Sequence, residues 1–183
     1  MSEKVRKKFW EIFERFGVDS TRIDLMGLLP LHRDHLSAYG LVDLSLDTWP
    51  YAGTTTTCEA LWMGVPVVTL QGEACHAHNV GVSLLSQIGH ERFIARNIEE
   101  YIRIAITLAS DVQQLQDIRK TLRAQITQSY LCDGATFTQH LEGVYHELWT
   151  RWCKTSAPSV SSGASVANLL HPVNTSAPLA QLS

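Results

Sequence analysis

Short apolar runs alternate with amphipathic segments along most of this chain. The run at 67–70 (VVTL) has the character of a strand that is buried on both faces of a sheet. Similar runs at 23–26, 42–46 and 93–95 predict three further short strands. Apolar residues at helical spacing predict helices at about 3–16, 36–41, 56–63, 79–88, 98–108, 112–128 and 137–152.

Strands that alternate with helices predict an α/β fold, with a parallel, Rossmann-like sheet and flanking helices. Ligands of such sheets bind beyond the carboxyl ends of the strands. Asp47, the residues 54–57 and the residues 72–78 each follow a predicted strand. We therefore expect these three groups to meet at one edge of the sheet.

A run of four threonines, 54–57, follows Gly53 and opens a predicted helix. The first amides of a helix have no partner within the helix, and its dipole is positive at that end. Phosphate is a common guest of such a site. Asp47, at the end of the preceding strand, is expected to fix the backbone of the turn. Helix capping alone is the competing interpretation, but one cap needs only one threonine.

Glu59 lies in the same helix and has two possible roles. The sequence from Thr56 to Glu59 fits a capping box, in which the Glu59 carboxylate returns to the backbone amide of the cap residue. Facing outward instead, Glu59 would accept hydrogen bonds from sugar hydroxyls beside a bound diphosphate. The sequence leaves both roles open.

Three histidines lie near the expected site. His76 and His78 belong to a segment that we expect to be a loop leaning over the anion, where they would donate to phosphate; surface histidines without a role are the alternative. A metal site is not expected, because it needs three or four suitably spaced ligands. His35, in a short helix that Asp34 is expected to cap, faces either the ligand crevice or the helix surface.

Composition narrows the class of protein. The chain has 183 residues, 45% hydrophobic residues and a formal net charge of −3, which argues against a nucleic-acid surface. It shows no signal peptide and no apolar run long enough to span a membrane. The four cysteines show no CxxC spacing. These features predict a cytoplasmic protein with free thiols, or a nucleocytoplasmic one in a eukaryote.

The end of the chain differs from the rest. From residue 155 onward it contains no Asp, Glu, Lys or Arg and repeats the tetrapeptide TSAP. Such a segment cannot bury much apolar surface. We expect two parts, a folded domain at 1–153 and a low-complexity, disordered tail at 154–183.

The residues 27–85, GLLPLHRDHLSAYGLVDLSLDTWPYAGTTTTCEALWMGVPVVTLQGEACHAHNVGVSLL, resemble the C-terminal catalytic region of glycosyltransferase family 41. That family contains the O-GlcNAc transferases and the SPINDLY-type protein O-glycosyltransferases, and the threonine run and HAHNVGVSLL are closer to the latter. The resemblance runs from about residue 5 to Cys153 and includes YLCDGATFTQHLEGVYHELW. A long ordered match of this kind is more specific than a lone glycine motif.

The resemblance implies the C-terminal half of a GT-B fold, which binds the donor nucleotide sugar. Thr54, Thr55 and Thr56 would hold the diphosphate after the Gly53 turn, Glu59 would contact the ribose, and His35 would line the nucleotide pocket. The loop at 72–79, with His76 and His78, would close over the phosphates. No cofactor or metal is implied, because protein donors stabilise the leaving diphosphate.

Departures from the family pattern bear on the donor. O-GlcNAc transferases carry His at the position of Thr54, Asp at Glu59, and Arg at Ala38 and Asn79. These differences favour a SPINDLY-type donor such as GDP-fucose over UDP-GlcNAc. The acceptor would be a Ser or Thr hydroxyl of a protein, and neither nucleic acid nor a membrane is an expected partner.

The resemblance also implies elements that this sequence does not include. In the family, an N-terminal catalytic half supplies the proposed base, an upstream lysine stabilises the departing phosphate, and TPR repeats precede both. We expect a fragment of a protein O-glycosyltransferase that forms part of the donor site. The alternatives are an inactive module kept for protein interaction and a GT-B transferase with a glycan acceptor.

Overall fold

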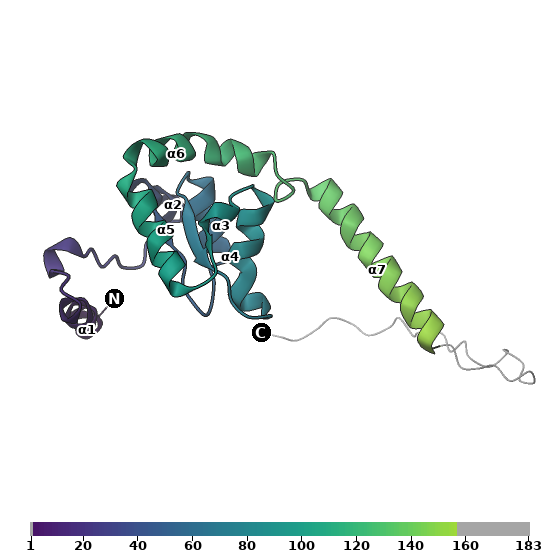
Figure 1. Ribbon diagram of the computed structural model, residues 1–183, viewed down its shortest axis with the longest axis horizontal. Helices are drawn as coiled ribbons and strands as arrows, with labels where there is room; N and C mark the ends of the chain where they lie inside the picture. The colour runs from purple at the N-terminus through teal and green to yellow at the C-terminus, as the bar shows by residue number, and fades with distance from the viewer. Residues whose placement is uncertain (1, 157–183) are drawn as a thin grey trace, which may run out of the picture. The chain divides into compact units, whose positions relative to one another are not determined.

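The computed structural model describes residues 2–156 (Figure 1), and the expected disordered tail from residue 157 lies outside them. The chain divides into two compact units, Met1–Phe137 and Thr138–Ser183. The first unit contains a three-stranded sheet and its covering helices. In the second unit, the described residues are those of helix α7 (Gly134–Ser156), which begins just before the division. Three residues expected in the tail, 154–156, are the last residues of this helix.

The sheet is parallel, with the strand order β1 (Ser45–Leu46), β2 (Val67–Leu70) and β3 (Ile94–Ala95). Ser45 pairs with Val67, and Thr69 pairs with Ile94. The central strand β2 has the predicted bounds, and its first three residues are buried. This arrangement confirms the expected α/β, Rossmann-like class.

Helices cover both faces of the sheet (Figure 1). Helices α3 (Thr55–Trp62) and α4 (His76–Gln87) are the two crossovers between neighbouring parallel strands. Helices α4 and α5 (Ile98–Ser110) both pack on β2, and α6 (Val112–Thr127) packs on α3 and α5. The core between them contains, among others, Leu61, Val65, Val67, Val68, Leu85, Leu108 and Leu122.

The remaining elements precede the sheet. They are α1 (Glu3–Arg15), the 3-10 turn η1 (Ser20–Arg22), α2 (His32–Ala38) and the 3-10 turn η2 (Tyr39–Leu41). Another 3-10 turn, η3 (Glu91–Phe93), leads into β3. Helix α3 ends before Gly64, whose φ of +80° lies in the left-handed region that glycine adopts without strain.

The strand predicted at 23–26 is wrong. Asp19 caps η1 by accepting hydrogen bonds from the Thr21 amide and hydroxyl at 2.8 and 2.6 Å, and irregular backbone follows up to α2. Within the described residues, β1 pairs only with β2, so the apolar run at 23–26 has no ladder partner. The strand predicted at 42–46 is also shorter than expected, because the Val42 carbonyl accepts instead from Arg119 Nη1 at 2.6 Å.

Candidate functional site

Asp47 directly follows β1 at the carboxyl edge of the sheet. Its Oδ1 accepts hydrogen bonds from the amides of Gly53 at 2.8 Å and Thr48 at 3.0 Å, and its Oδ2 accepts from the Thr69 hydroxyl at 2.8 Å. The Tyr101 hydroxyl donates to its backbone carbonyl at 2.8 Å. The prediction that Asp47 fixes the turn is confirmed.

Two glycines allow the backbone to approach this carboxylate closely. A Cβ on Gly53 would lie 2.7 Å from the hydroxyl oxygens of both Thr56 and Thr57. A Cβ on Gly81, in α4, would lie 2.6 Å from Asp47 Oδ2 and 2.5 Å from the Thr69 hydroxyl oxygen. The turn and helix α4 therefore close around Asp47 only because both residues lack a side chain.

The four threonines divide into two kinds. Thr54, Thr55 and Thr56 are exposed at the start of α3, and the side chain of the N-cap residue Thr54 caps no amide. Thr57 is buried, and its hydroxyl donates to the Gly53 carbonyl at 3.0 Å. Three residues thus present hydroxyls at the positive end of the helix, while the fourth holds the turn in place.

Glu59 does not form the capping box that its spacing allows. Helix α3 begins at Thr55, one residue earlier than expected, so Glu59 lies beyond the third helical position that a capping box requires. Its Oε2 lies 3.0 Å from Nε2 of His35, which comes from α2. The Glu59 side chain is 17% exposed and that of His35 is 41% exposed. The His35 ring is thus turned toward Glu59 on α3.

Tyr39 is a third member of this cluster, and sequence reasoning missed it. Its hydroxyl lies 3.2 Å from the Thr56 carbonyl and 3.5 Å from Glu59 Oε2. Its ring meets the ring of His35 edge to face, with centroids 5.7 Å apart. Burial, with a smaller contribution from the charge of Glu59, raises the pKa of the Tyr39 phenol above its ordinary value. The phenol is therefore protonated at neutral pH and acts as a donor.

A cavity of about 380 Å³ adjoins the His35–Tyr39 pair. Its lining residues are Met26, Gly27, Leu28, Leu29, His35, Ala38, Tyr39 and Val42. One wall is the irregular segment 26–29, which begins at the last residue of the run at 23–26 that was predicted to be a strand. The sequence feature that marks this wall of the cavity is GLLP at 27–30, in which a Gly and a Pro flank two leucines. In the structure one of these leucines, Leu28, is 92% exposed.

His76 and His78 lie in the first turn of α4 and not in the loop that the sequence predicted. The helix begins early because Asn79 organises the segment before it: its Oδ1 accepts from the Gly72 amide at 3.1 Å, and its Nδ2 donates to the carbonyls of Glu73 and Cys75 at 2.6 and 3.1 Å. His76 is exposed. His78 packs against Gly72, and its ring lies 6.2 Å from that of Trp49.

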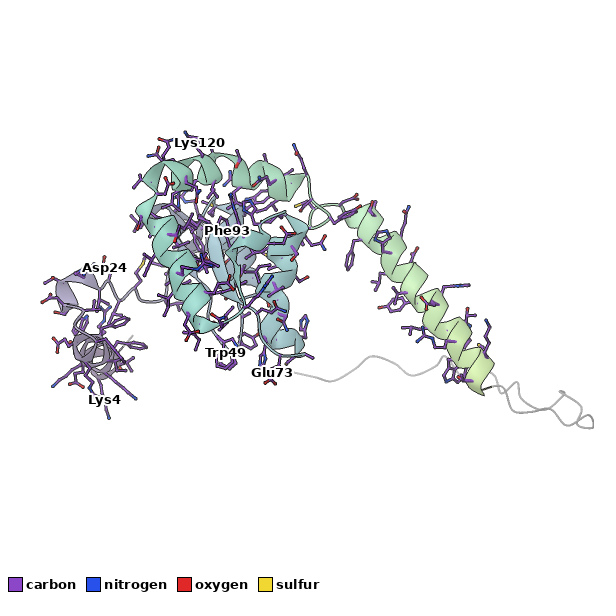
Figure 2. All side chains as sticks on the ribbon, viewed as in Figure 1. Lys4, Asp24, Trp49, Glu73, Phe93 and Lys120 are labelled. Carbon is purple, nitrogen blue, oxygen red and sulfur yellow. The ribbon has the colours of Figure 1, made fainter. Side chains whose placement is uncertain are left out.

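The two helix starts are joined directly. The Ala52 amide, just before the threonine turn, donates to the Ala77 carbonyl in α4 at 2.9 Å. Trp49 and Glu73 lie at the same end of the first unit (Figure 2) and line a second cavity, of about 460 Å³, with Arg96. The loops after β1 and β2 therefore lie together at the carboxyl edge of the sheet.

Several other predicted features differ or lie elsewhere. Asp34 does not cap α2, whose N-cap residue is Leu31. The cysteines are free and exposed, and partial burial raises the pKa of the Cys58 thiol, which makes it a weaker nucleophile. Among residues 2–156, no three His, Cys, Asp or Glu side chains gather in a group that could hold a metal ion. None of the helices in that range is long and apolar enough to cross a membrane.

Comparison with known proteins places these residues in a family context. The model of the family described as Glycosyl transferase family 41 matches residues 4–141. The Petunia hybrida protein described as a probable UDP-N-acetylglucosamine–peptide N-acetylglucosaminyltransferase SPINDLY is 52% identical over 158 residues, which are 86% of this chain and 17% of that protein. The Arabidopsis thaliana protein of the same description is 46% identical, with the same coverage.

A solved structure agrees with these matches. A mutant of the Thermobaculum terrenum O-GlcNAc transferase matches with a TM-score of 0.77 at 38% sequence identity, covering 85% of this chain and 29% of that one. The chain spans about 17% of the length of the SPINDLY proteins it matches.

Proposed function

Because this chain belongs to glycosyl transferase family 41, we propose that residues 4–141 form the donor-binding part of a protein O-glycosyltransferase. The donor is a nucleotide sugar, and the acceptor is a Ser or Thr hydroxyl of a protein. The observation that carries the proposal is the position of Glu59 on α3, the helix that begins with the exposed Thr54–Thr56, where its Oε2 lies 3.0 Å from Nε2 of His35 on α2.

The diphosphate binds at the start of α3 in this proposal. Thr54, Thr55 and Thr56 offer exposed hydroxyls beside the unpaired amides of the first helical turn. Asp47 holds the preceding turn in shape, so these donors are preorganised before a ligand arrives. His76, exposed at the start of α4, supplies a further donor, and His78 packs on Gly72 and orders the loop beside it.

The nucleoside binds next to the diphosphate. The base enters the cavity of about 380 Å³ beside His35, and Glu59 accepts from the ribose hydroxyls. Ala38 lines that cavity with a small side chain, which leaves room for a purine. This favours GDP-sugar donors over UDP-N-acetylglucosamine, the donor in the names of the SPINDLY relatives.

The reaction is a substitution at the anomeric carbon. The acceptor oxygen forms a bond to that carbon as the bond to the diphosphate oxygen breaks, and the acceptor proton passes to a base. Negative charge develops on the leaving diphosphate, where the amides and hydroxyls of α3 stabilise it more strongly than they stabilise the bound donor. We assign leaving-group stabilisation and donor orientation to these residues, and no role as the base.

Calorimetry with GDP, UDP, ADP, GDP-fucose and UDP-N-acetylglucosamine tests the proposal on the full chain. We expect measurable binding of GDP and GDP-fucose, with weaker binding of the UDP pair. If a sample that circular dichroism shows to be folded binds none of these ligands, the donor site is wrong. If UDP and UDP-N-acetylglucosamine bind more tightly than GDP and GDP-fucose, the donor site is supported but the proposed preference for guanine over uracil is wrong.

A further inference from the structure

Tyr39 bridges two parts of helix α3 from outside that helix. Its hydroxyl has one proton and two acceptors within reach, the Thr56 carbonyl at 3.2 Å and Glu59 Oε2 at 3.5 Å. Thr56 belongs to the helical turn that carries the exposed hydroxyls, and Glu59 lies on the next turn. One phenol therefore contacts the diphosphate end and the ribose end of the proposed site.

The contacts of Glu59 are uneven. Its Oε2 is engaged by His35 Nε2 at 3.0 Å and approached by the Tyr39 hydroxyl. Within residues 2–156, its other oxygen, Oε1, has no hydrogen-bond partner. A carboxylate that is held through one oxygen presents the second oxygen in a fixed direction, and a diol is a suitable donor to it.

We propose that Tyr39 is a positioning residue for the donor nucleotide: its hydroxyl holds the carboxylate of Glu59 so that Oε1 accepts from the ribose diol. This inference rests on the proposed function. It assigns the Tyr39 hydroxyl no contact with the ligand and no catalytic step. Preorganisation of this kind reduces the ordering that binding requires, and so improves affinity for ligands that carry the diol.

A structural role for Tyr39 is the competing explanation, because its ring also lines the cavity and packs on His35. The substitution Tyr39→Phe separates the two roles, since it keeps the ring and removes only the hydroxyl. A packing defect weakens the binding of all nucleotides by the same factor. Loss of Glu59 positioning weakens only ligands with ribose hydroxyls.

The first test compares GDP or UDP, whichever binds more tightly, with its 2′,3′-dideoxy analogue. For the wild-type chain we expect the Kd of the nucleotide with the diol to be about tenfold lower than that of the dideoxy analogue, because hydrogen bonds to a charged group are stronger than neutral ones. In Tyr39→Phe we expect this ratio to fall to about twofold. The control is Tyr145→Phe, on the exposed face of α7, which should leave the ratio unchanged.

A double variant shows whether Tyr39 acts through Glu59. If it does, Tyr39→Phe added to Glu59→Gln changes the diol ratio no further than Glu59→Gln alone. An unchanged ratio in Tyr39→Phe, or an equal loss for both ligands, overturns the proposal. Failure of the wild-type chain to bind any nucleotide overturns the proposed function as well.

A ligand-free measurement makes the inference testable even if Tyr39→Phe does not fold. Burial raises the pKa of the Tyr39 phenol most, and the charge and the hydrogen bond of Glu59 raise it further. Glu59→Gln should therefore lower the pKa of Tyr39, read by NMR from its ring carbon shifts as the pH rises. An unchanged pKa in that variant means that the hydroxyl and the carboxylate do not interact, and the inference is then wrong whatever the chain binds.

Discussion

The carboxylate of Asp47 accepts a hydrogen bond from the backbone amide of Gly53 at 2.8 Å, and this bond closes the turn before the threonine run. The same side chain accepts from the Thr48 amide and the Thr69 hydroxyl. One carboxylate thus ties β1, β2 and the start of α3 together. The geometry of the proposed diphosphate site depends on a residue that does not itself face the ligand.

Removing this carboxylate should affect both folding and binding. Asp47→Ala leaves the Gly53 amide, the Thr48 amide and the Thr69 hydroxyl without their acceptor. We expect a loss of about 3 kcal/mol in the free energy of unfolding, measured with urea, and loss of nucleotide binding. Asp43→Ala is the matched control, because Asp43 is exposed four residues earlier, and it should change stability by less than about 0.5 kcal/mol. Equal effects of the two substitutions would contradict this account.

A methyl group at either close-approach glycine should destabilise the fold. Gly53→Ala places Cβ 2.7 Å from two threonine hydroxyl oxygens, and Gly81→Ala places it 2.6 Å from Asp47 Oδ2. Overpacking of this kind costs about 1–3 kcal/mol, which a thermal or urea unfolding curve resolves. Gly40→Ala is the control, because a Cβ there meets no atom within 4 Å. Stability that is unchanged by Gly81→Ala would mean that α4 is free to move away from the sheet edge.

Much of this edge could be predicted from the sequence because its determinants are local. The VVTL run specifies a buried strand by itself, and the bounds of β2 match the prediction. Asp47 acts on the residues directly after it, so turn chemistry is enough to assign its role. The division of the threonines is different, because only the packing of α3 buries Thr57 and leaves Thr54–Thr56 exposed.

Contacts between distant segments escaped sequence reasoning. His35 and Glu59 are 24 residues apart, and no periodicity indicates that α2 and α3 meet at these positions. Tyr39 gave no signal, since a tyrosine between an alanine and a glycine near the end of a short helix is typical of ordinary packing. The run at 23–26 has strand-like composition, but a strand also needs a ladder partner, and β1 pairs only with β2 in the part of the chain that the structure describes.

Tyr101 predicts a specific pH dependence of stability. Burial, with a contribution from Asp47, raises the pKa of Tyr101 to about 12, from an ordinary value of 10.0. Between these values the unfolded chain has lost the phenol proton and the folded chain still holds it, so the free energy of unfolding falls as pH rises. The stabilisation is complete below about pH 10 and is lost by about pH 12.

The substitution Tyr101→Phe isolates this effect from the titration of other groups. It also removes the hydrogen bond to the Asp47 carbonyl. We therefore expect the free energy of unfolding at pH 8 to be about 1 kcal/mol higher for wild type than for the variant. Urea midpoints measured from pH 8 to pH 12 should converge as the pH rises. A difference that stays constant across this range would show that Tyr101 titrates alike in the folded and unfolded chains.

Neighbouring threonines should separate binding from folding. Thr55 is exposed at the start of α3, whereas Thr57 is buried and donates to the Gly53 carbonyl at 3.0 Å. Thr55→Val removes a hydroxyl but keeps the shape and the β-branch, so we expect about fivefold weaker GDP binding in calorimetry, with stability unchanged to within about 0.5 kcal/mol. Guanosine, which has no phosphate, should bind the wild-type chain and Thr55→Val with equal affinity.

Thr57→Val should show the opposite pattern. The valine methyl replaces a buried hydroxyl and leaves the Gly53 carbonyl without its donor, which should lower the free energy of unfolding by about 1–2 kcal/mol. At a temperature where this variant is folded, its affinity for GDP should fall less than that of Thr55→Val. The reason is that the Thr57 hydroxyl of the wild-type chain faces the turn and not the ligand. If Thr55→Val leaves GDP binding intact while Thr57→Val abolishes it, the exposed hydroxyls are not the phosphate ligands and the turn backbone alone carries the site.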